Sequence, residues 1–552
     1  MPISDPGRRG DHGRHGSSAG SRLLEQIDST ITRDTRQKTR QKSQRRPHRK
    51  SHQTRSRPPE PPDLIVSYVA SNLIDAYFSF YNSYYPVLHE KTFRDRVATG
   101  QSQRLPHSPW RVTYYMVLAI GHWASCKESE HQQSKYYAAA RASLSLEMLE
   151  SGTIETVQAF LLLGNYLQKR DRTNTAYNFV GLAYRMALGL GLHRESPAAE
   201  NTIGHERRRQ LFWTIFCVES GFNITLGRPP IISEGFIDIK LPRNIDDKGL
   251  SLMSPMPEEV DYPTTYSAIV HLTPLAKIAD GIYREFLLAK TAGTRIEYRH
   301  AESMERDLIQ WRKGLPHYLH SADVPAWFQG ARSVARWKEQ NIRILLWRGT
   351  QKYHSYLPTK MNSEERCLDA AMETIHDIAG FCTMYDGALY QGITWYATYF
   401  LLQATLVLMA RFLDNTVVSS EEEASAWHHS VFKARNCLRV VAARNKPATR
   451  YLDMLDRVCS QFQSPTLEQN LYSLSSLQED LLAPSVNDLP HNTEDFLGLP
   501  SENDFALLGD SQFALNDEAA DPNFRILINQ VSHDFMGSMP LDLLFNDWIN
   551  YS

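Results

Sequence analysis

Four short motifs contain residue types that serve catalysis or ligand binding in other proteins. Residues 16–20 match the G-x-S-x-G pattern of a nucleophilic serine, but such a serine needs a strand before it and a helix after it, and the flanking sequence predicts neither. Asp246 and Asp247 are acids of the type that binds magnesium, yet they stand in a Pro- and Gly-rich loop without further acids at helical spacing. We therefore predict no catalytic residue and no enzyme.

The other two motifs have ordinary structural explanations. Gly189-Leu190-Gly191 is too short for a dinucleotide-binding fingerprint, and Gly191 is predicted to end a helix. Asn223-Ile224-Thr225 is a glycosylation sequon that stays unused without a secretory route. The scattered histidines lack the spacing of zinc ligands, so His193 is predicted to be a core or capping residue. The sequence predicts neither a metal nor a cofactor.

Charge divides the chain into three parts, although the whole is nearly neutral with 60 Lys and Arg against 62 Asp and Glu. Residues 1–60 hold 15 basic and 6 acidic residues, whereas residues 479–552 hold 14 acidic residues and one basic residue, Arg525. Such segregation is typical of a folded body flanked by charged interaction segments. We predict three parts: a disordered basic segment at 1–62, an all-helical body at 63–460 and a disordered acidic segment at 461–552.

The basic segment is densest from residue 31 to residue 57, with eleven Lys and Arg against one acid, Asp34. Such a run attracts phosphates or an acidic import receptor by charge alone, without reading a base sequence. The residues predicted to serve nuclear import or phosphate contact are Arg45, Arg46, Arg49 and Lys50. No aromatic residue interleaves the cations, which argues against a stacking surface for single strands. A merely solvated tail is the alternative.

The acidic segment interleaves Asp and Glu with Phe, Leu and Trp in three clusters, at 494–500, 503–510 and 539–550. This composition is typical of disordered activation segments, in which acids keep aromatic side chains solvated until a partner groove accepts them. The last cluster would place its apolar residues on one face of an induced helix. The predicted activation residues are Phe496, Phe505, Leu541, Leu544, Phe545 and Trp548. A solvated tail that docks a short helix on the body is the alternative.

The cysteines and the apolar stretches indicate a protein of a reducing compartment, without a membrane. Six cysteines in 552 residues, none within three positions of another, are too sparse for a disulfide scaffold. The N-terminus lacks the apolar core of a signal peptide. The longest apolar stretch, residues 394–410, contains Gln403 and is shorter than the roughly 20 residues that cross a bilayer. We predict a buried helix there.

Helical spacing of apolar residues recurs through the body and predicts an all-α fold, as in Leu211, Ile215, Val218 and Phe222. Strand signals are weak, and no repeat period of a regular solenoid is apparent, so irregular helix packing is expected. Surface loops are predicted at 241–265 and 414–425, which are rich in turn or charged residues.

Two features of the helices are predicted in more detail. The turn 171–175 has the length of an αα-hairpin loop, and small residues would let its two flanking helices approach closely. These small residues are Gly164, Gly181, Ala183, Ala187 and Gly189. Arg207–Arg209 are predicted at a helix start on the surface, and residues 227–230 at its stop, with Arg228 tying that turn to a carboxylate or a carbonyl.

Four runs of the body, in a fixed order, resemble one known family. They are YFSFYNSYYPVLHEKTF (77–93), TVQAFLLLGNYLQ (156–168), AYNFVGLAYRMALGLGLHRE (176–195) and ERRRQLFWTIFCVESGFNITLGRPPIISEGFIDIKLP (206–242). Together they resemble the fungal-specific transcription factor domain over about residues 65–350. This domain is the middle homology region of fungal zinc-cluster regulators, of the xylanolytic-activator type. The resemblance implies an all-helical regulatory domain in a nuclear protein with an acidic C-terminal activator.

Two features depart from the family pattern. Glu219-Ser220 stands where the family more often has an Asp-Arg pair, a minor change. The family also usually carries an N-terminal DNA-binding cluster of six cysteines opening with C-x2-C-x6-C, whereas the first cysteine here is Cys126. The Arg-rich segment resembles the linker that follows such a cluster. Either an upstream exon carries the zinc cluster or the protein works without its own.

The predicted function is that of a nuclear regulator of RNA polymerase II transcription. We expect a pathway-specific activator that controls a metabolic or secondary-metabolite gene cluster. Its expected partners are promoter DNA, contacted directly or through a partner, the transcription machinery, contacted through the acidic tail, and a second subunit in a homo- or heterodimer. The alternative is a co-regulator that does not read DNA and pairs with a full-length zinc-cluster factor.

Overall fold

The computed structural model describes the central part of the chain. The described residues are 67–99, 107–125, 134–170, 172–195, 202–231, 234–294, 296–351, 357–385, 389–413 and 421–442, with short stretches between 445 and 456. Two sets of predicted contact residues lie outside them, namely Arg45, Arg46, Arg49 and Lys50 in the basic segment and Phe496, Phe505, Leu541, Leu544, Phe545 and Trp548 in the acidic segment. The two charged segments and their boundaries therefore stay predictions.

The described residues are α-helical, as predicted, and contain no strand beyond two isolated bridges, Thr202 with Pro255 and Ile245 with Glu259. The first helices are α2 (Ser67–Phe80), α3 (Glu90–Ala98), α4 (Pro109–Ser125), α5 (Lys135–Ala142), α6 (Glu147–Ser151), α7 (Ile154–Gln168), α8 (Thr173–Gly189) and α9 (Ile203–Leu226), followed by the short 3-10 turn η2 (Glu234–Phe236). The later helices are α10 (Ser267–Ala292), α11 (Tyr298–Lys313), α12 (His317–His320), α13 (Ala326–Gln351), α14 (Leu357–Met384), α15 (Gln391–Leu413) and α16 (Glu421–Ala442).

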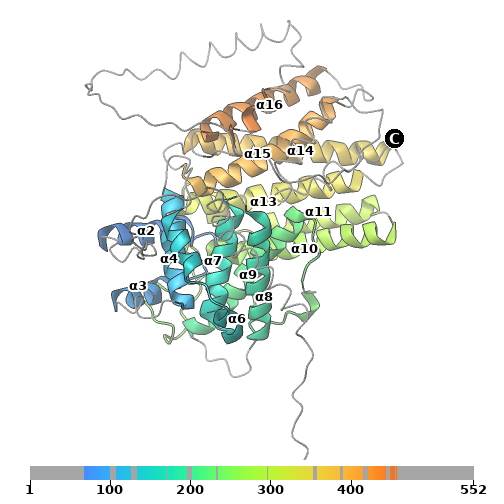
Figure 1. The fold of residues 1–552 in the computed structure, drawn as a ribbon. Coiled ribbons are helices and arrows are strands. Elements are labelled where there is room, and N and C mark those ends of the chain that lie inside the picture. The colour runs from blue at the N-terminus through green and yellow to red at the C-terminus, as the bar shows by residue number, and fades with distance from the viewer. Residues whose placement is uncertain are drawn as a thin grey trace, which may run out of the picture. The chain divides into compact units, whose positions relative to one another are not determined.

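The helices form two sets that run crosswise to each other (Figure 1). In the first set, α4 packs on α2, α5 and α7, and α8 packs on α7 and α9. In the second set, α13 packs on α14, and α14 on α15 and α16. Helix α10 contacts both α9 and α13, so it joins the two sets. No regular repeat relates these helices, in agreement with the predicted irregular packing.

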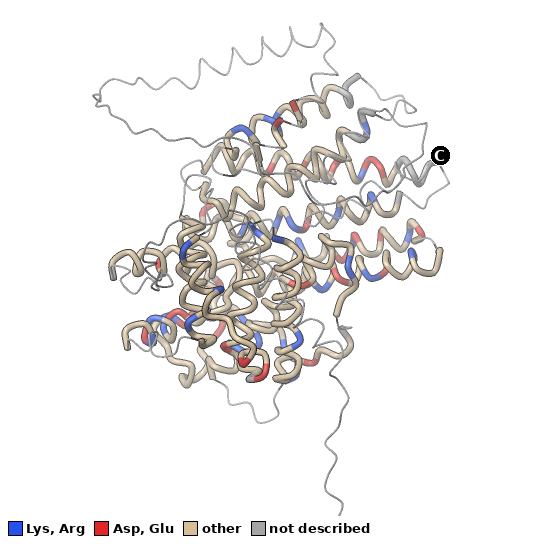
Figure 2. The backbone as a smooth tube through the Cα atoms, in the orientation of Figure 1, with Lys and Arg blue, Asp and Glu red and all other residues tan. Residues whose placement is uncertain are grey.

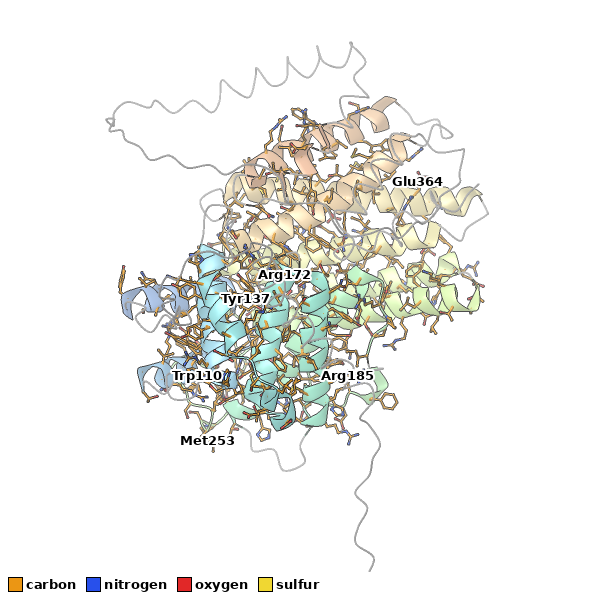
Figure 3. All side chains as sticks on the ribbon, viewed as in Figure 1. Trp110, Tyr137, Arg172, Arg185, Met253 and Glu364 are labelled. Carbon is orange, nitrogen blue, oxygen red and sulfur yellow. The ribbon has the colours of Figure 1, made fainter. Side chains whose placement is uncertain are left out.

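A single cluster of buried apolar side chains runs through both sets, from Ala70 to Leu455. Side chains fill the spaces between the helices (Figure 3), and the largest fully buried ones include Trp213, Trp337 and Trp347. Helix α15 is long and apolar enough to cross a membrane, but 83% of its most apolar window is buried inside the protein. The predicted buried helix at 394–410 is therefore a core helix, as expected.

The α7–α8 hairpin confirms the predicted close approach at Gly164, and the predicted small residues Ala183 and Ala187 are fully buried. A Cβ atom on Gly164 would lie 2.6 Å from Val180 Cγ2 and 3.0 Å from the Ala176 carbonyl oxygen, so a larger residue would separate the two helices. No atom lies within 4 Å of such a Cβ at Gly181 or Gly189, so these two small residues were wrongly assigned to the contact. Gly191 follows the helix end with a φ of 68°, which confirms its predicted capping role.

Two boundaries differ from the sequence prediction. Helix α8 begins at Thr173, inside the predicted turn 171–175, and α16 begins at Glu421, inside the predicted loop 414–425. The loop at 241–265 has no helix, as predicted.

The prediction that Arg207 lies at a helix start on the surface is wrong. Helix α9 begins four residues earlier, at Ile203, and the Arg207 side chain is buried. Its guanidinium donates to the Pro86 carbonyl oxygen at 2.8 Å and to Gln210 Oε1 at 2.7 Å. The helix stop at Gly227 is confirmed, because this residue has a φ of 65° that favours glycine.

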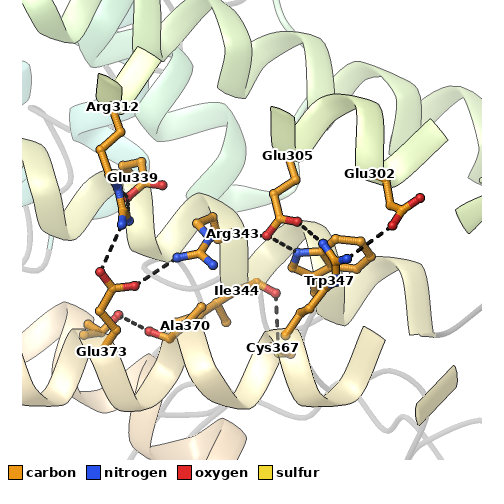
Figure 4. Close-up of polar contacts among 12 residues, drawn as sticks. Glu302, Glu305, Arg312, Glu339, Arg343, Ile344, Trp347, Cys367, Ala370 and Glu373 are labelled. Carbon is orange, nitrogen blue, oxygen red and sulfur yellow. Dashed lines mark hydrogen bonds and ion pairs between the residues drawn. The ribbon is translucent and has the colours of Figure 1, made fainter. Parts of the chain in front are cut away.

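Charged residues of both signs alternate along the described helices (Figure 2), and many of them pair between α11, α13 and α14. Arg312 on α11 forms ion pairs with Glu339 on α13 and with Glu373 on α14 (Figure 4). Arg343 donates to Glu373 Oε2 at 2.9 Å. Glu339 is only 1% exposed, so its charge depends on these cations for the stabilisation that water would otherwise give.

Glu305 is the second buried acid of this network. It accepts a hydrogen bond from Trp347 Nε1 at 2.8 Å and forms an ion pair with Arg366 on α14 (Figure 4). Its side chain is 5% exposed. The three helices are thus joined by buried acids: Glu339 links α13 to α11, and Glu305 links α11 to both α13 and α14.

We predict that Arg312→Ala lowers the free energy of unfolding by about 2–4 kcal/mol, because it leaves Glu339 buried without its nearest cation. Arg336→Ala is the matched control, since the Arg336 side chain is 57% exposed although it also pairs with Glu373 and Asp377. This control should cost less than about 1 kcal/mol. Urea unfolding followed by circular dichroism measures both changes. Equal losses in the two variants would contradict the role given to Glu339.

Candidate functional site

A cavity of about 110 Å³ lies where α7, α9, α10, α13 and α15 meet. Most of its wall is apolar or aromatic, and a few polar groups converge on it, as in many small-molecule sites. The polar residues of the wall include Asn165, Gln168, Ser220, Thr225, Lys338 and Asn341, and its larger apolar and aromatic residues include Tyr85, Leu272, Leu275, Ile342, Trp395, Tyr396 and Phe400.

Tyrosine hydroxyls fix the aromatic side of this cavity. Tyr85, in the turn after α2, shares a hydrogen bond of 2.8 Å with Tyr396 on α15. One residue earlier, Tyr84 shares a hydrogen bond of 2.6 Å with Tyr390. Burial raises the pKa of Tyr84 and Tyr396 well above their usual value, so these phenols stay neutral. The two pairs hold the turn after α2 against the N-terminal part of α15 and the residue that precedes it.

Lys169 lies against these rings, one residue beyond the C-terminal end of α7, and is only 7% exposed. Its Nζ donates to Asn165 Oδ1 at 2.7 Å and lies 5.0 Å from the ring centre of Trp395, 5.4 Å from Tyr396 and 5.5 Å from Tyr85. Burial, together with the neighbouring Lys338, lowers the pKa of Lys169 well below its usual value. The ammonium group is thus satisfied by ring faces and an amide, which stabilise a charge less than a carboxylate does.

Lys338 on α13 is the second cation of the site and lines the cavity itself. Its Nζ donates to the Tyr85 hydroxyl at 3.2 Å and lies 5.4 Å from the centre of the same ring that Lys169 approaches. Among the described residues, neither lysine has an ion pair with a carboxylate. Two ammonium groups therefore share one aromatic wall without an anion between them.

Two amides complete the polar surface of the cavity. Asn165 Oδ1 accepts hydrogen bonds from Lys169 and, at 2.9 Å, from the Tyr81 hydroxyl, so its Nδ2 remains as a donor. Asn341 is 7% exposed, and its buried Oδ1 has no hydrogen-bond donor. A buried acceptor without a partner costs free energy, so Asn341 is suited to a group that enters from the cavity.

A second cavity, of about 300 Å³, lies between α3, α4, α7 and α9 and differs in its charges. Two of the three arginines in its wall already have partners in the protein, since Arg96 pairs with Glu155 and Arg207 donates to Gln210 and Pro86. The smaller cavity, with Lys169 and Lys338, is therefore the candidate functional site.

The motifs rejected on sequence grounds have structural roles in the described residues. Asp247 accepts a hydrogen bond from the Tyr266 hydroxyl, whereas Asp246 accepts one from Tyr262 at 3.3 Å, so the two acids serve different partners. No group of three His, Cys, Asp or Glu residues in the described part of the chain is placed to hold a metal. Asn223, the sequon asparagine, is fully buried and donates to Glu219 Oε1 at 2.6 Å.

His193 and Arg228 have folding contacts. The His193 carbonyl oxygen accepts hydrogen bonds from the Asp238 and Ile239 amides, which fits its predicted core or capping role. Arg228 donates to Asn174 Oδ1 at 3.3 Å and lies 4.1 Å from the Tyr177 ring centre. Arg228 thus connects this turn to a neighbouring helix, as predicted. Its contacts in the described residues are a side-chain amide and an aromatic ring, where a carboxylate or a backbone carbonyl was predicted.

The sequence analysis missed every residue of the cavity. One signal was present, because Asn165 and Lys169 are four positions apart on the apolar face of a buried helix and so occupy core positions with polar groups. The sequence around Lys338 could not reveal its place in the cavity wall, because α13 carries many charged residues and only the packing of the helices shows which one faces the cavity.

Glu219, on α9 beside the cavity residues Val218 and Ser220, is a buried acid with amide donors only. It is 3% exposed and accepts hydrogen bonds from Asn223 Nδ2 and the Ile231 amide. Burial raises its pKa to about 7, and the nearby Asp280 carboxylate adds to this rise. The fold thus buries an acid whose pKa burial raises to about 7.

Comparison with known proteins identifies one domain in the described region. Residues 74–313 match the model of the fungal specific transcription factor domain, from within α2 to the end of α11. No solved structure matches the chain. The cavity therefore joins residues of the matched domain, such as Asn165, with residues beyond it, such as Lys338 and Trp395.

The curated relatives are regulators named for different processes. The chain is 27% identical over 357 residues to the lactose regulatory protein LAC9 of Kluyveromyces lactis, covering 61% of this chain and 37% of that protein. It is 24% identical to activator of stress genes 1 of Saccharomyces cerevisiae, covering 70% and 42%. It is also 24% identical to an ABC-transporter-regulating transcription factor of Aspergillus oryzae, covering 45% and 28%. The chain thus spans less than half the length of each of these relatives.

We predict that Glu219→Gln makes the protein more stable at high pH. The folded protein holds the Glu219 proton up to about pH 7, whereas an unfolded glutamate loses it near its ordinary pKa of 4.5, so the stability contributed by this group falls as pH rises through that window. The advantage of the variant over the wild type should grow by on the order of 3 kcal/mol from pH 4 to pH 8. Urea unfolding at several pH values measures it.

The exposed loop residue Glu258 provides the control for this prediction. Glu258→Gln should leave the difference from wild type flat across the same pH range. A flat difference for Glu219→Gln as well would show that Glu219 is ionised in the folded protein at neutral pH.

Proposed function

Because residues 74–313 form a fungal specific transcription factor domain, the domain of zinc-cluster transcription regulators, we propose that this chain is a nuclear, pathway-specific activator of RNA polymerase II transcription. The family is one of regulators and not of enzymes, and the domain match is the observation that carries the proposal. The described helices supply a regulatory body, while the charged segments on either side of it supply the contacts with other molecules.

The composition of the two charged segments supports the parts of this proposal that the domain match does not reach. The cations Arg45, Arg46, Arg49 and Lys50 belong to a run that an acidic import receptor or a phosphate backbone would attract. The tail after residue 479 combines acids with aromatic residues in the manner of an activator. Activation is also in the name of one relative, which acts on stress genes.

The regulated pathway is proposed at the level of a class. The names of three relatives refer to lactose, stress genes and an ABC transporter, so the shared domain serves different target genes. We place this chain with regulators of a metabolic or secondary-metabolite gene cluster. Dimerisation with a second copy or with a related regulator belongs to the same proposal.

Substituting the four cations Arg45, Arg46, Arg49 and Lys50 by Gln should abolish nuclear accumulation of a fluorescent fusion, because the import receptor loses its charge contacts. The control replaces Arg8, Arg9, Arg14 and Arg22, four cations of the same segment outside the dense run, and should stay nuclear. Exclusion of both variants from the nucleus would assign import to total charge and not to the predicted motif.

Deleting residues 479–552 should abolish activation of a reporter when the chain is fused to a heterologous DNA-binding domain. The sharper variant, Phe545→Ala with Trp548→Ala, removes two aromatic anchors without changing charge and should lower output at least about tenfold, as loss of hot-spot aromatics does. Phe513→Ala with Phe524→Ala, in the same tail outside the three clusters, is the matched control. Unchanged output after the deletion would remove the activation role.

Salt-dependent binding of the purified chain to promoter DNA and scrambled DNA separates the activator from the co-regulator. Equal binding that is lost at physiological salt reflects phosphate attraction alone, and it would favour a chain that depends on a DNA-reading partner. A preference for promoter DNA that survives physiological salt would favour direct reading.

A further inference from the structure

Among the described residues, no carboxylate pairs with Lys338 in the wall of the smaller cavity or with Lys169, which lies behind its aromatic rings. Both ammonium groups lie within 5.5 Å of the centre of the Tyr85 ring. Like charges held together in a partly buried place repel each other and lose hydration. A bound anion would remove both costs, which makes this wall a place for a negatively charged ligand.

The amides define what else the ligand needs. Asn165 is held by Lys169 and Tyr81 through its oxygen, so its Nδ2 can donate to an anion beside Lys338. Asn341 Oδ1 is buried without a donor and needs an N–H or O–H group. Asn341 comes three residues after Lys338 on α13, so both side chains lie on the same face of this helix. One small molecule can therefore reach both.

The size and the walls of the cavity define the rest of the ligand. A volume of about 110 Å³ has room for roughly seven water-sized groups, which corresponds to an organic molecule of about ten heavy atoms or fewer. Leu272, Leu275, Ile342 and Phe400 also line the cavity and favour an apolar body. A free phosphate would satisfy the cations but would leave these apolar surfaces without a partner.

We propose that this cavity binds a small organic acid that combines one carboxylate, one hydroxyl or amine group and an apolar body. The carboxylate contacts Lys338 and Asn165, with Lys169 supporting it from behind the aromatic wall. The hydroxyl or amine donates to Asn341 Oδ1. Because the wall comes both from the transcription factor domain and from α13 and α15, such a ligand would fasten these two parts together.

The first experiment measures thermal unfolding and titration calorimetry of the full chain with two acids, 3-hydroxybenzoate and 2-hydroxyisovalerate. Their primary amides keep the shape without the charge, and benzoate keeps the charge without the hydroxyl. We expect at least one hydroxy acid to raise the unfolding temperature, its amide to have no effect, and benzoate to bind about tenfold more weakly than 3-hydroxybenzoate if the latter binds. Absence of a shift with both hydroxy acids, or an equal shift with the amides, overturns the proposal.

Two lysine variants test whether binding occurs in this cavity. Lys338→Met should lower affinity for the acid at least about tenfold, whereas Lys290→Met, an exposed lysine on α10, should leave affinity unchanged. Lys169→Met should raise the unfolding temperature of the free protein, because it removes a buried cation without a carboxylate, and should still weaken binding.

The lysine variants also distinguish a lost site from a misfolded protein. A stabilised Lys169→Met that no longer responds to the acid can only have lost the site. Wild-type affinity in Lys338→Met overturns the proposal. These readouts use the purified chain and do not depend on transcription, so the proposed function and the ligand site can fail independently.

Discussion

The hydrogen bond between the Tyr85 and Tyr396 hydroxyls is the contact on which the candidate site depends. It joins residues 311 positions apart, and each ring also packs beside both lysines. Together with the bond between Tyr84 and Tyr390, it holds the turn after α2 against the start of α15 and places two of the three rings that surround Lys169. The bond therefore joins two distant parts of the chain and also fixes two residues of the cavity wall.

The two sets of helices are held together by different forces on their two sides. On the cavity side, neutral phenols and aromatic faces meet around two unbalanced cations. On the side of α11, α13 and α14, acids and guanidinium groups pair closely, and each buried acid has at least one cation. Among the described residues, charges are thus nearly balanced in the α11–α13–α14 network and unbalanced beside the cavity.

The helical fold could be predicted from the sequence because amphipathic spacing is local, as in Leu211 and Ile215, and a loop such as 241–265 carries its own turn residues. The cavity could not, because Lys169 and Lys338 become neighbours only through the packing of α7 and α13 around Tyr85. The burial of Arg207 was missed for the same reason, since its main acceptor, the Pro86 carbonyl oxygen, lies 121 positions away. Local sequence patterns thus predict the helices and loops, whereas the contacts of buried charged side chains depend on residues far away in the sequence.

The deep burial of α15 has a consequence for how the protein is made. During synthesis the tyrosines of the turn after α2 leave the ribosome long before residue 396, and at 5–20 residues per second this delay is roughly 15–60 s. Throughout this time the apolar surface that α15 will cover has no native partner. A nascent chain of this kind therefore exposes apolar surface until α15 has been synthesised.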